Sequence, residues 1–169
     1  SLPGISMEFY RLSIRDLTNN GSQPMWDFSK RYLIVFNGEI YNSEELKKKI
    51  DTKNLKSRSD TEILINLYAK YKKDIVNFLE GMFSFIIYDK IENSCFVVRD
   101  RFGIKPIYYY SDNKKIVFCS EIKPLIKYIG SCKINNKTLK EFFLKGHIDH
   151  NYLTFFKNIN SLEPSRFLH

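Results

Sequence analysis

The residues best suited to chemistry are Asn37, Gly38 and Glu39, which directly follow the apolar run 33–36. That run of four residues, three of them β-branched or aromatic, predicts a strand that is covered on both faces. Asn37-Gly38 is expected to end the strand, because these two residue types most readily adopt unusual backbone angles. The resulting polar corner can direct an amide side chain and backbone N–H groups at a developing oxyanion, as acyl transfer requires.

The same dipeptide has a second interpretation. Asn-Gly is the strongest short signal for a β-hairpin turn, and taken alone Asn37-Gly38 favours a tight turn. The choice between a turn and an oxyanion-binding corner therefore depends on the flanking sequence.

The composition indicates a globular chain of mixed secondary structure. With 169 residues, of which 43% are hydrophobic, the chain is one domain or one domain of a longer protein. Fourteen Phe and eleven Tyr against one Trp favour a sheet-rich or mixed fold. No apolar run approaches the roughly 20 residues that span a bilayer, so we expect a soluble protein without a membrane partner.

The net charge of +8 raises the question of a nucleic-acid partner. The lysines are scattered and no nucleic-acid-binding motif accompanies them, so none is expected. Cys95, Cys119 and Cys132 match neither a zinc site nor a disulfide framework, which favours a reducing, cytoplasmic compartment. His147 and His150 have no further ligand nearby in the sequence, so no metal site is expected.

Patterning predicts helices and strands in alternation. The expected helices cover residues 43–50, 63–71 (with Ser59 or Asp60 at its cap), 74–79, 121–128 and 138–144. The expected strands cover residues 11–17, 32–37, 82–89, 94–100, 107–110, 115–120 and 152–156. Consecutive hairpins interrupted by helices predict an α+β fold, in which helices cover antiparallel sheets.

Seven stretches in order resemble the glutaminase domain of glutamine-hydrolysing asparagine synthetases, and together they span nearly the whole chain. They are residues 11–17, 23–25, 36–42, 59–62, 81–85, 99–109 and 120–123. The resemblance implies that 1–169 is a partial class II glutamine amidotransferase domain. The implied fold is that of the N-terminal-nucleophile hydrolases, a four-layer α/β/β/α sandwich, here incomplete at the N-terminus.

The resemblance also implies roles for five residues. Arg11 would pair with the α-carboxylate of L-glutamine, while Asp60 and Glu39 would hold its α-amino group. The Asn37 side-chain amide and the Gly38 N–H would form the oxyanion hole. Each residue type suits its role, since guanidinium and carboxylate form a two-pronged ion pair. Alternatively, Arg11 is a surface ion-pairing residue, Asp60 a helix cap and Glu39 a solvated acid of a turn.

In this family an N-terminal cysteine attacks the glutamine amide and releases ammonia to a synthetase domain. Only ten residues precede Arg11, and Ser1 lies too close to it to replace that cysteine. We therefore expect part of a longer enzyme that does not hydrolyse glutamine by itself. No pyrophosphate-binding loop is present, so ATP and Mg²⁺ are expected only in a C-terminal synthetase domain of the same chain, and this domain needs no cofactor.

Two departures from the family pattern leave other interpretations open. Phe9-Tyr10 stands where the family usually has His-Arg, and Ser165-Arg166 stands where it usually has Gly-His. One alternative is a degenerate domain that binds a partner or regulates. Another is a relative that delivers ammonia to an acceptor other than aspartate. The sequence also leaves the assembly state open, with a homodimer as one alternative.

Overall fold

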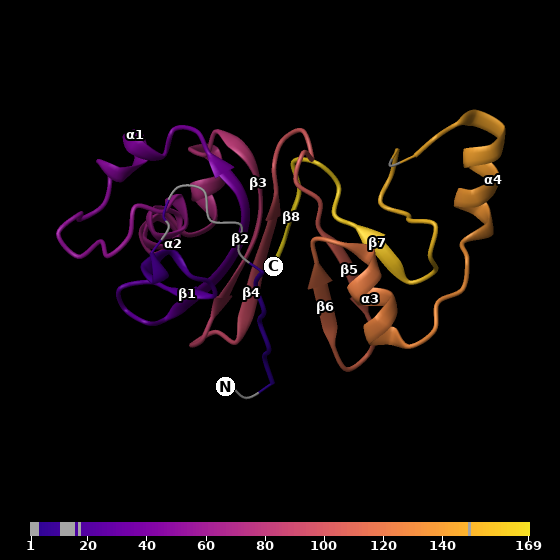
Figure 1. Ribbon diagram of the computed structural model, residues 1–169, viewed down its shortest axis with the longest axis horizontal. Coiled ribbons are helices and arrows are strands. Elements are labelled where there is room, and N and C mark those ends of the chain that lie inside the picture. Colours follow the sequence, from indigo (N-terminus) through magenta and orange to yellow (C-terminus); the bar gives the residue numbers. More distant parts are fainter. Residues whose placement is uncertain (1–3, 11–15, 17, 149) are drawn as a thin grey trace. The chain divides into compact units, whose positions relative to one another are not determined.

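The structure, a computed structural model, describes residues 4–10, 16, 18–148 and 150–169. The chain divides into two compact units (Figure 1). The first contains Ser1–Val98 and Phe167–His169, and the second contains Arg99–Arg166. The predicted strand over residues 11–17, including the candidate site residue Arg11, lies outside the described residues except for Asp16.

The first unit is built on a sheet of five strands in the order β1-β2-β3-β4-β8. These strands are Met25–Trp26, Tyr32–Ile40, Gly81–Asp89, Ser94–Arg99 and Phe167–Leu168. The two longest, β2 and β3, pair antiparallel along their whole length, from Tyr32 opposite Asp89 to Ile40 opposite Gly81. This ladder of nine residue pairs is the longest in the sheet among the registers described.

Helices α1 (Ser43–Lys47) and α2 (Asp60–Tyr71) lie on one side of this sheet (Figure 1). Nine consecutive residues of α2, from Asp60 to Tyr68, are buried. The core forms between α2 and alternate residues of β2 and β3, among them Ile34, Phe36 and Phe85. A short 3₁₀ helix, Lys72–Asn77, follows α2 directly, and another, Asn19–Gly21, precedes β1.

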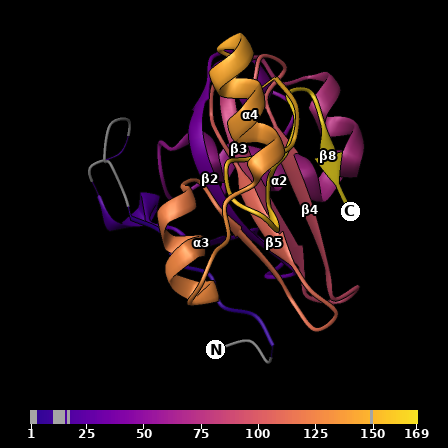
Figure 2. The same cartoon turned by 90° about the vertical axis from the view of Figure 1, so that its right-hand side faces the viewer.

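The second unit contains a smaller antiparallel sheet in the order β6-β5-β7. Its strands are Tyr108–Ser111 (β5), Ile116–Cys119 (β6) and Ile159–Ser161 (β7). Helices α3 (Ile122–Ile129) and α4 (Asn136–Lys145) belong to the same unit and face the viewer in Figure 2. Both end at a left-handed glycine, Gly130 and Gly146, whose N–H bonds back to the last turn.

Most predicted elements are confirmed, including both hairpins and the helix capped by Ser59. Four predictions need correction, and the first three concern single elements. The strand predicted over residues 152–156 is wrong, because only isolated bridges at Leu153 and Phe156 form there and the strand follows at β7. Helix α1 is shorter than predicted. The segment after α2 is a 3₁₀ helix rather than an α-helix.

The most consequential correction concerns Asn37-Gly38. This dipeptide neither ends the strand nor makes a hairpin turn, because β2 continues through it to Ile40. Pairing with Ser84 and Phe83 of β3 is unbroken at both residues. The sequence predicts that glycine ends the strand, because glycine adopts backbone angles that other residues avoid. Gly38 does adopt such an angle, with a φ of +139°, but it does so inside the paired strand.

The turn after β4 is a structural corner that is held together by two charged residues. The Arg99 guanidinium donates to the carbonyl oxygens of Gly103 (2.7 Å), Lys105 (3.1 Å) and Leu162 (2.6 Å). The buried Asp100 carboxylate accepts the N–H groups of residues 102, 104 and 105. These groups satisfy the polar backbone of a tight turn.

Glycine is required inside this corner. Gly103 has a φ of +66°, and a Cβ placed there would lie 2.7 Å from Cγ of Pro164 and 3.1 Å from Cζ of Arg99. Ser165, where the family pattern has glycine, also has a positive φ of 58°. That backbone angle is a physical reason for the family's preference, because residues other than glycine adopt it at a cost.

An ion pair ties the start of β2 to the end of β3. Arg31 Nε donates to Asp89 Oδ1 (2.9 Å), and its Nη2 donates to Oδ2 (2.6 Å). The N–H groups of Ile91 and Glu92 also donate to this carboxylate. Burial by itself would raise the pKa of Asp89, but the hydrogen bonds from Arg31 and the two N–H groups lower it below the ordinary value.

We predict that Gly103→Ala destabilises the protein more than Gly146→Ala. The two glycines have nearly the same φ, +66° and +67°, but nothing lies within 4 Å of a Cβ at Gly146. Both substitutions carry the strain of a left-handed residue, about 1 kcal/mol, and only the first adds a steric clash, worth a further ~1–3 kcal/mol. Denaturant unfolding measures both, and equal losses would contradict the packing argument.

A second prediction concerns acid stability. Since the pKa of Asp89 is lowered in the folded state, its stabilising effect is complete above the ordinary Asp pKa of about 4 and is lost as the pH falls through the folded value. Asp89→Asn should therefore flatten the fall in unfolding free energy below that pH, as followed by denaturant unfolding across a pH series. The exposed Asp74→Asn is the control, and an unchanged slope in Asp89→Asn would refute the assignment.

Candidate active site

The candidate site lies where the C-terminal half of β2 meets the N-terminus of α2. The backbone N–H of Ile40 donates to Asp60 Oδ2 at 3.0 Å, which joins the strand to the first residue of the helix. Four of the five predicted site residues are thereby brought to one region, namely Asn37, Gly38, Glu39 and Asp60. Arg11 lies outside the described residues.

Strand alternation separates the polar residues of β2 from the core. Phe36 and Ile40 are 4% and 1% exposed and pack in the core that contains α2, whereas Asn37, Gly38 and Glu39 are half-buried. Since successive side chains of a strand point to opposite faces, Asn37 and Glu39 stand together on the sheet face away from this core. One strand thus supplies an amide and a carboxylate to one face.

The edge of β2 that faces away from β3 carries the Gly38 N–H. Strand β1 covers this edge only opposite Leu33 and Ile34. Beyond it, the side chain of Gln23 pairs with Phe36, accepting its N–H at 2.6 Å and donating to its carbonyl oxygen at 3.1 Å. Because alternate residues direct their backbone groups to the same edge, the Gly38 N–H lies between the contact of Gln23 with Phe36 and that of Asp60 with Ile40.

Two glycines, Gly38 on β2 and Gly81 on β3, allow the two strands to pair beside the site. A Cβ at Gly38 would lie 2.0 Å from the carbonyl oxygen of Met82, and a Cβ at Gly81 would lie 2.1 Å from that of Glu39. Their φ angles, +139° and +153°, are ones that other residues rarely adopt. Neither position accepts a side chain, so glycine is required on both strands beside Asn37 and Glu39.

Asp60 is held by the N-terminus of α2 and by the loop before it. Ser59 caps the helix by accepting the N–H of Glu62, and Asp60 follows as the first helical residue, 7% exposed. The positive end of the helix favours the negative charge of a carboxylate at this position. Asp60 therefore begins the helix and links it to β2. The residue that caps the helix is Ser59, not Asp60.

Sequence reasoning missed three residues that support this arrangement. The buried Glu62 carboxylate accepts the N–H groups of Lys56 and Ser57, which shapes the loop before α2. The buried Asp16 accepts the N–H of Arg58 in that loop at 2.8 Å. Gln23 is the third. The pattern Ser59-x-x-Glu62 is a capping-box signal that could have revealed Glu62; Asp16 and Gln23 act across long sequence separations and carry no local signal.

Within the first unit, the one cysteine among the described residues is Cys95 on β4. All three cysteines of the chain are free, and burial raises the pKa of the Cys95 thiol on β4, which disfavours the reactive thiolate. Cys119 and Cys132 belong to the second unit.

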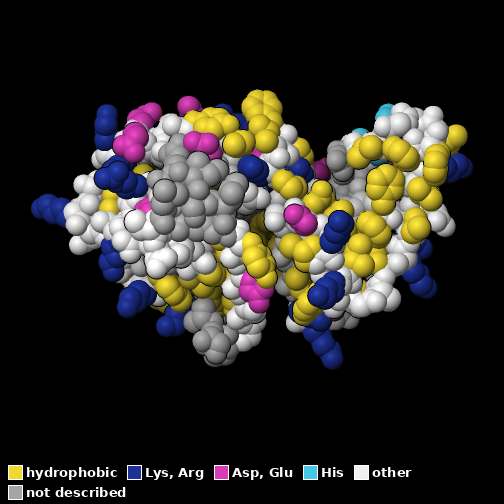
Figure 3. Space-filling model, in the orientation of Figure 1, with side chains coloured by type: hydrophobic (Ala, Val, Ile, Leu, Met, Phe, Trp, Pro, Cys, Tyr) yellow, Lys and Arg dark blue, Asp and Glu magenta, His cyan; other side chains and the backbone are white. Residues whose placement is uncertain are grey.

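The described residues also include no group of three or more His, Cys, Asp and Glu side chains able to hold a metal ion. Within the part of the chain that the structure describes, no helix is both long and apolar enough to cross a bilayer. Lysine and arginine side chains are dispersed among apolar and acidic ones on the face drawn in Figure 3, as the scattered sequence positions predicted.

Comparison with known proteins gives consistent results. Residues 3–169 match a family described as the glutamine amidotransferase domain. The chain is 37% identical over 169 residues to asparagine synthetase [glutamine-hydrolyzing] 2 of Bacillus subtilis, covering 97% of this chain and 22% of that protein. It is also 37% identical to a putative asparagine synthetase [glutamine-hydrolyzing] 2 of Methanocaldococcus jannaschii, covering 94% of this chain and 34% of that one.

A solved structure shares the fold. The structure titled as the allosteric regulatory enzyme of purine biosynthesis aligns with 88% of this chain and 29% of its own, with a TM-score of 0.60 and 19% identity. The chain spans only about a fifth to a third of the curated relatives it matches. The chain therefore belongs to the class II glutamine amidotransferase domain family and is related to the glutamine-hydrolysing asparagine synthetases.

Proposed function

We propose that this domain binds L-glutamine and, in a protein that supplies an N-terminal cysteine, hydrolyses it to glutamate and ammonia for ATP-dependent asparagine synthesis. The observation that carries the proposal is the contact of Asp60 with the Ile40 N–H, in a chain that matches the family from residue 3 to residue 169. That contact brings the acid proposed for the substrate's amino group to the strand that carries the proposed oxyanion hole.

The chemistry requires each group in turn. A cysteine thiolate adds to the side-chain amide carbon of glutamine, with its own α-amine as the base. The oxyanion that forms would accept hydrogen bonds from the Asn37 side-chain amide and the Gly38 N–H, both preorganised by the β2–β3 ladder. Expulsion of ammonia leaves a thioester, and water then releases glutamate and restores the thiol.

The substrate's charged end would be recognised by opposite charges. Asp60 and Glu39 are assigned to the α-ammonium group and Arg11 to the α-carboxylate, where a guanidinium forms a two-pronged pair. We assign ATP and Mg²⁺ to a synthetase domain of the same chain and no cofactor to this domain. Stacking of the two sheets as a four-layer sandwich and a cytoplasmic location, which three free cysteines favour, are part of the same proposal.

We predict that Asp60→Asn weakens binding of L-glutamine roughly ten- to hundredfold, because a charge-assisted hydrogen bond is worth roughly 1.5–3 kcal/mol. The same variant should bind 4-carbamoylbutanoate, which is glutamine without its α-amino group, as the parent protein does. Isothermal titration of both ligands checks this, with the exposed Asp51→Asn as control. Equal weakening for both ligands would instead assign Asp60 a structural role.

A further prediction concerns turnover in a natural gene product with an N-terminal cysteine. Glutamate release from L-glutamine should fall to background when that cysteine is changed to alanine, while glutamine binding persists. If the folded parent protein neither binds nor hydrolyses glutamine, the degenerate binding or regulatory domain becomes the better description. Formation of an amide other than asparagine would redirect the ammonia to another acceptor.

A further inference from the structure

A second candidate site lies at the opposite end of α2. An open cavity of about 530 Å³ lies between the loop before β2, the segment after α1 and the C-terminal end of α2. A helix of twelve residues extends roughly 18 Å, so this cavity is distinct from the site at Asp60. Its volume falls in the range of small-molecule sites, about 300–1,000 Å³.

The lining of the cavity holds four cationic side chains and two carboxylates, so its net charge is positive. Lys49, Lys70 and Lys72 all contribute to it, and among the described residues none of their ammonium groups is paired with a carboxylate. The two carboxylates of the lining, Asp27 and Asp51, already accept backbone N–H groups: Asp27 accepts those of Arg31 and Tyr32 at 2.9 and 2.8 Å, and Asp51 accepts that of Lys53 at 3.0 Å. Like charges gathered in this way repel one another, and a bound anion would relieve the repulsion.

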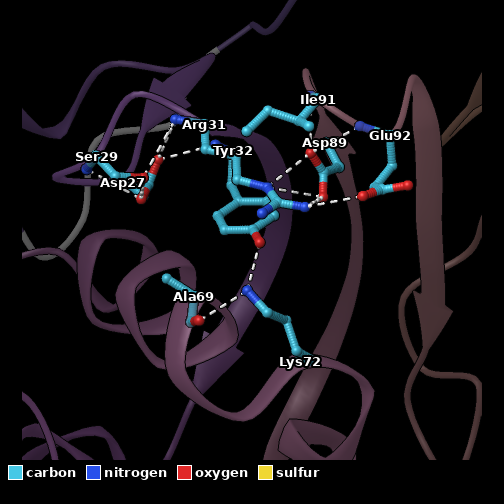
Figure 4. Close-up of polar contacts among 9 residues, drawn as sticks. All are labelled: Asp27, Ser29, Arg31, Tyr32, Ala69, Lys72, Asp89, Ile91 and Glu92. Carbon is cyan, nitrogen blue, oxygen red and sulfur yellow. Dashed lines mark hydrogen bonds and ion pairs between the residues drawn. The ribbon is translucent and has the colours of Figure 1, made fainter.

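Two of the three ammonium groups are held in position by the fold. Lys72 Nζ donates to the Tyr32 hydroxyl and, at 2.8 Å, to the carbonyl oxygen of Ala69 (Figure 4). Lys70 Nζ donates to the carbonyl oxygen of Lys49 at 2.9 Å. An ammonium group has three donors, so both lysines keep donors for a ligand. Because they are already ordered, less entropy is lost on binding.

The backbone at Lys72 supports a role for its side chain. Its φ of 51° and ψ of −135° place a non-glycine residue in the left-handed range at the end of α2. Glycine would fit there without strain, but only a lysine brings an ammonium group over the Tyr32 ring, 4.3 Å from its centroid. Strain of this kind is often found at ligand-binding positions.

The lining also contains apolar surface. Phe28 is 41% exposed and lines the cavity, whereas Tyr32, which also belongs to the lining, is buried at 2% exposure. We propose that this cavity binds a small organic anion in which a phosphate group is joined to a flat apolar body. Lysine ammonium groups would bind the phosphate, and the exposed Phe28 side chain would cover the flat body.

Isothermal titration with phenyl phosphate, inorganic phosphate, benzoate and benzyl alcohol tests each part of the proposal. Phenyl phosphate should bind most tightly and should weaken as the salt concentration rises. Inorganic phosphate and benzyl alcohol each lack one part and should bind more weakly. If benzoate binds as tightly as phenyl phosphate, a carboxylate rather than a phosphate is the preferred anion, and that part of the proposal is wrong.

Variants locate the binding. Lys70→Gln and Lys72→Gln should each weaken phenyl phosphate binding about tenfold, the value of one charge-assisted contact. Lys123→Gln, an exposed lysine of the second unit, removes the same charge and should change nothing. Thermal melting shows whether Lys72→Gln still folds, and the exposed Lys70→Gln serves as the independent variant. Equal weakening by Lys123→Gln, or no saturable binding of any probe, would overturn the proposal.

Discussion

The close approach of β2 and β3 at Gly38 and Gly81 is the constraint on which the rest of the first unit depends. At both positions a side chain would collide with the backbone of the facing strand. The two strands therefore stay paired through the polar segment as far as Ile40. A rigid ladder is what preorganisation of hydrogen-bond donors requires, since donors that are already ordered need no rearrangement during the reaction.

Helix α2 is fastened to β2 at both ends, and each attachment accompanies a candidate site. At the N-terminus the Asp60 carboxylate accepts the Ile40 N–H, and at the C-terminus Lys72 reaches the Tyr32 hydroxyl. The core between them is apolar and closely packed. The polar groups therefore lie at the two ends of α2, outside the apolar core. The N-terminal end carries a carboxylate, and the C-terminal end carries ammonium groups.

Much of the fold could be predicted from local sequence. The helix after Ser59 and the two hairpins follow from capping and alternation, which act over a few residues. The strand predicted over residues 152–156 failed because its apolar residues pack individually, as Phe155 does against Phe142 of α4, while pairing with β5 falls to Ile159–Ser161. Which segment pairs with β5 therefore depends on residues that are distant in the sequence.

The sequence by itself determined the family, the mixed fold and the residue types of the candidate site, because these lie in ordered local motifs such as 36–42 and 59–62. Only the tertiary structure decided that Asn37-Gly38 is strand rather than turn, because pairing with Ser84 and Phe83 of β3 continues β2 through both residues. The tertiary structure likewise decided that Gln23 bonds to the backbone of Phe36 and that three lysines line one cavity with Tyr32. These residues meet through contacts that no local pattern encodes.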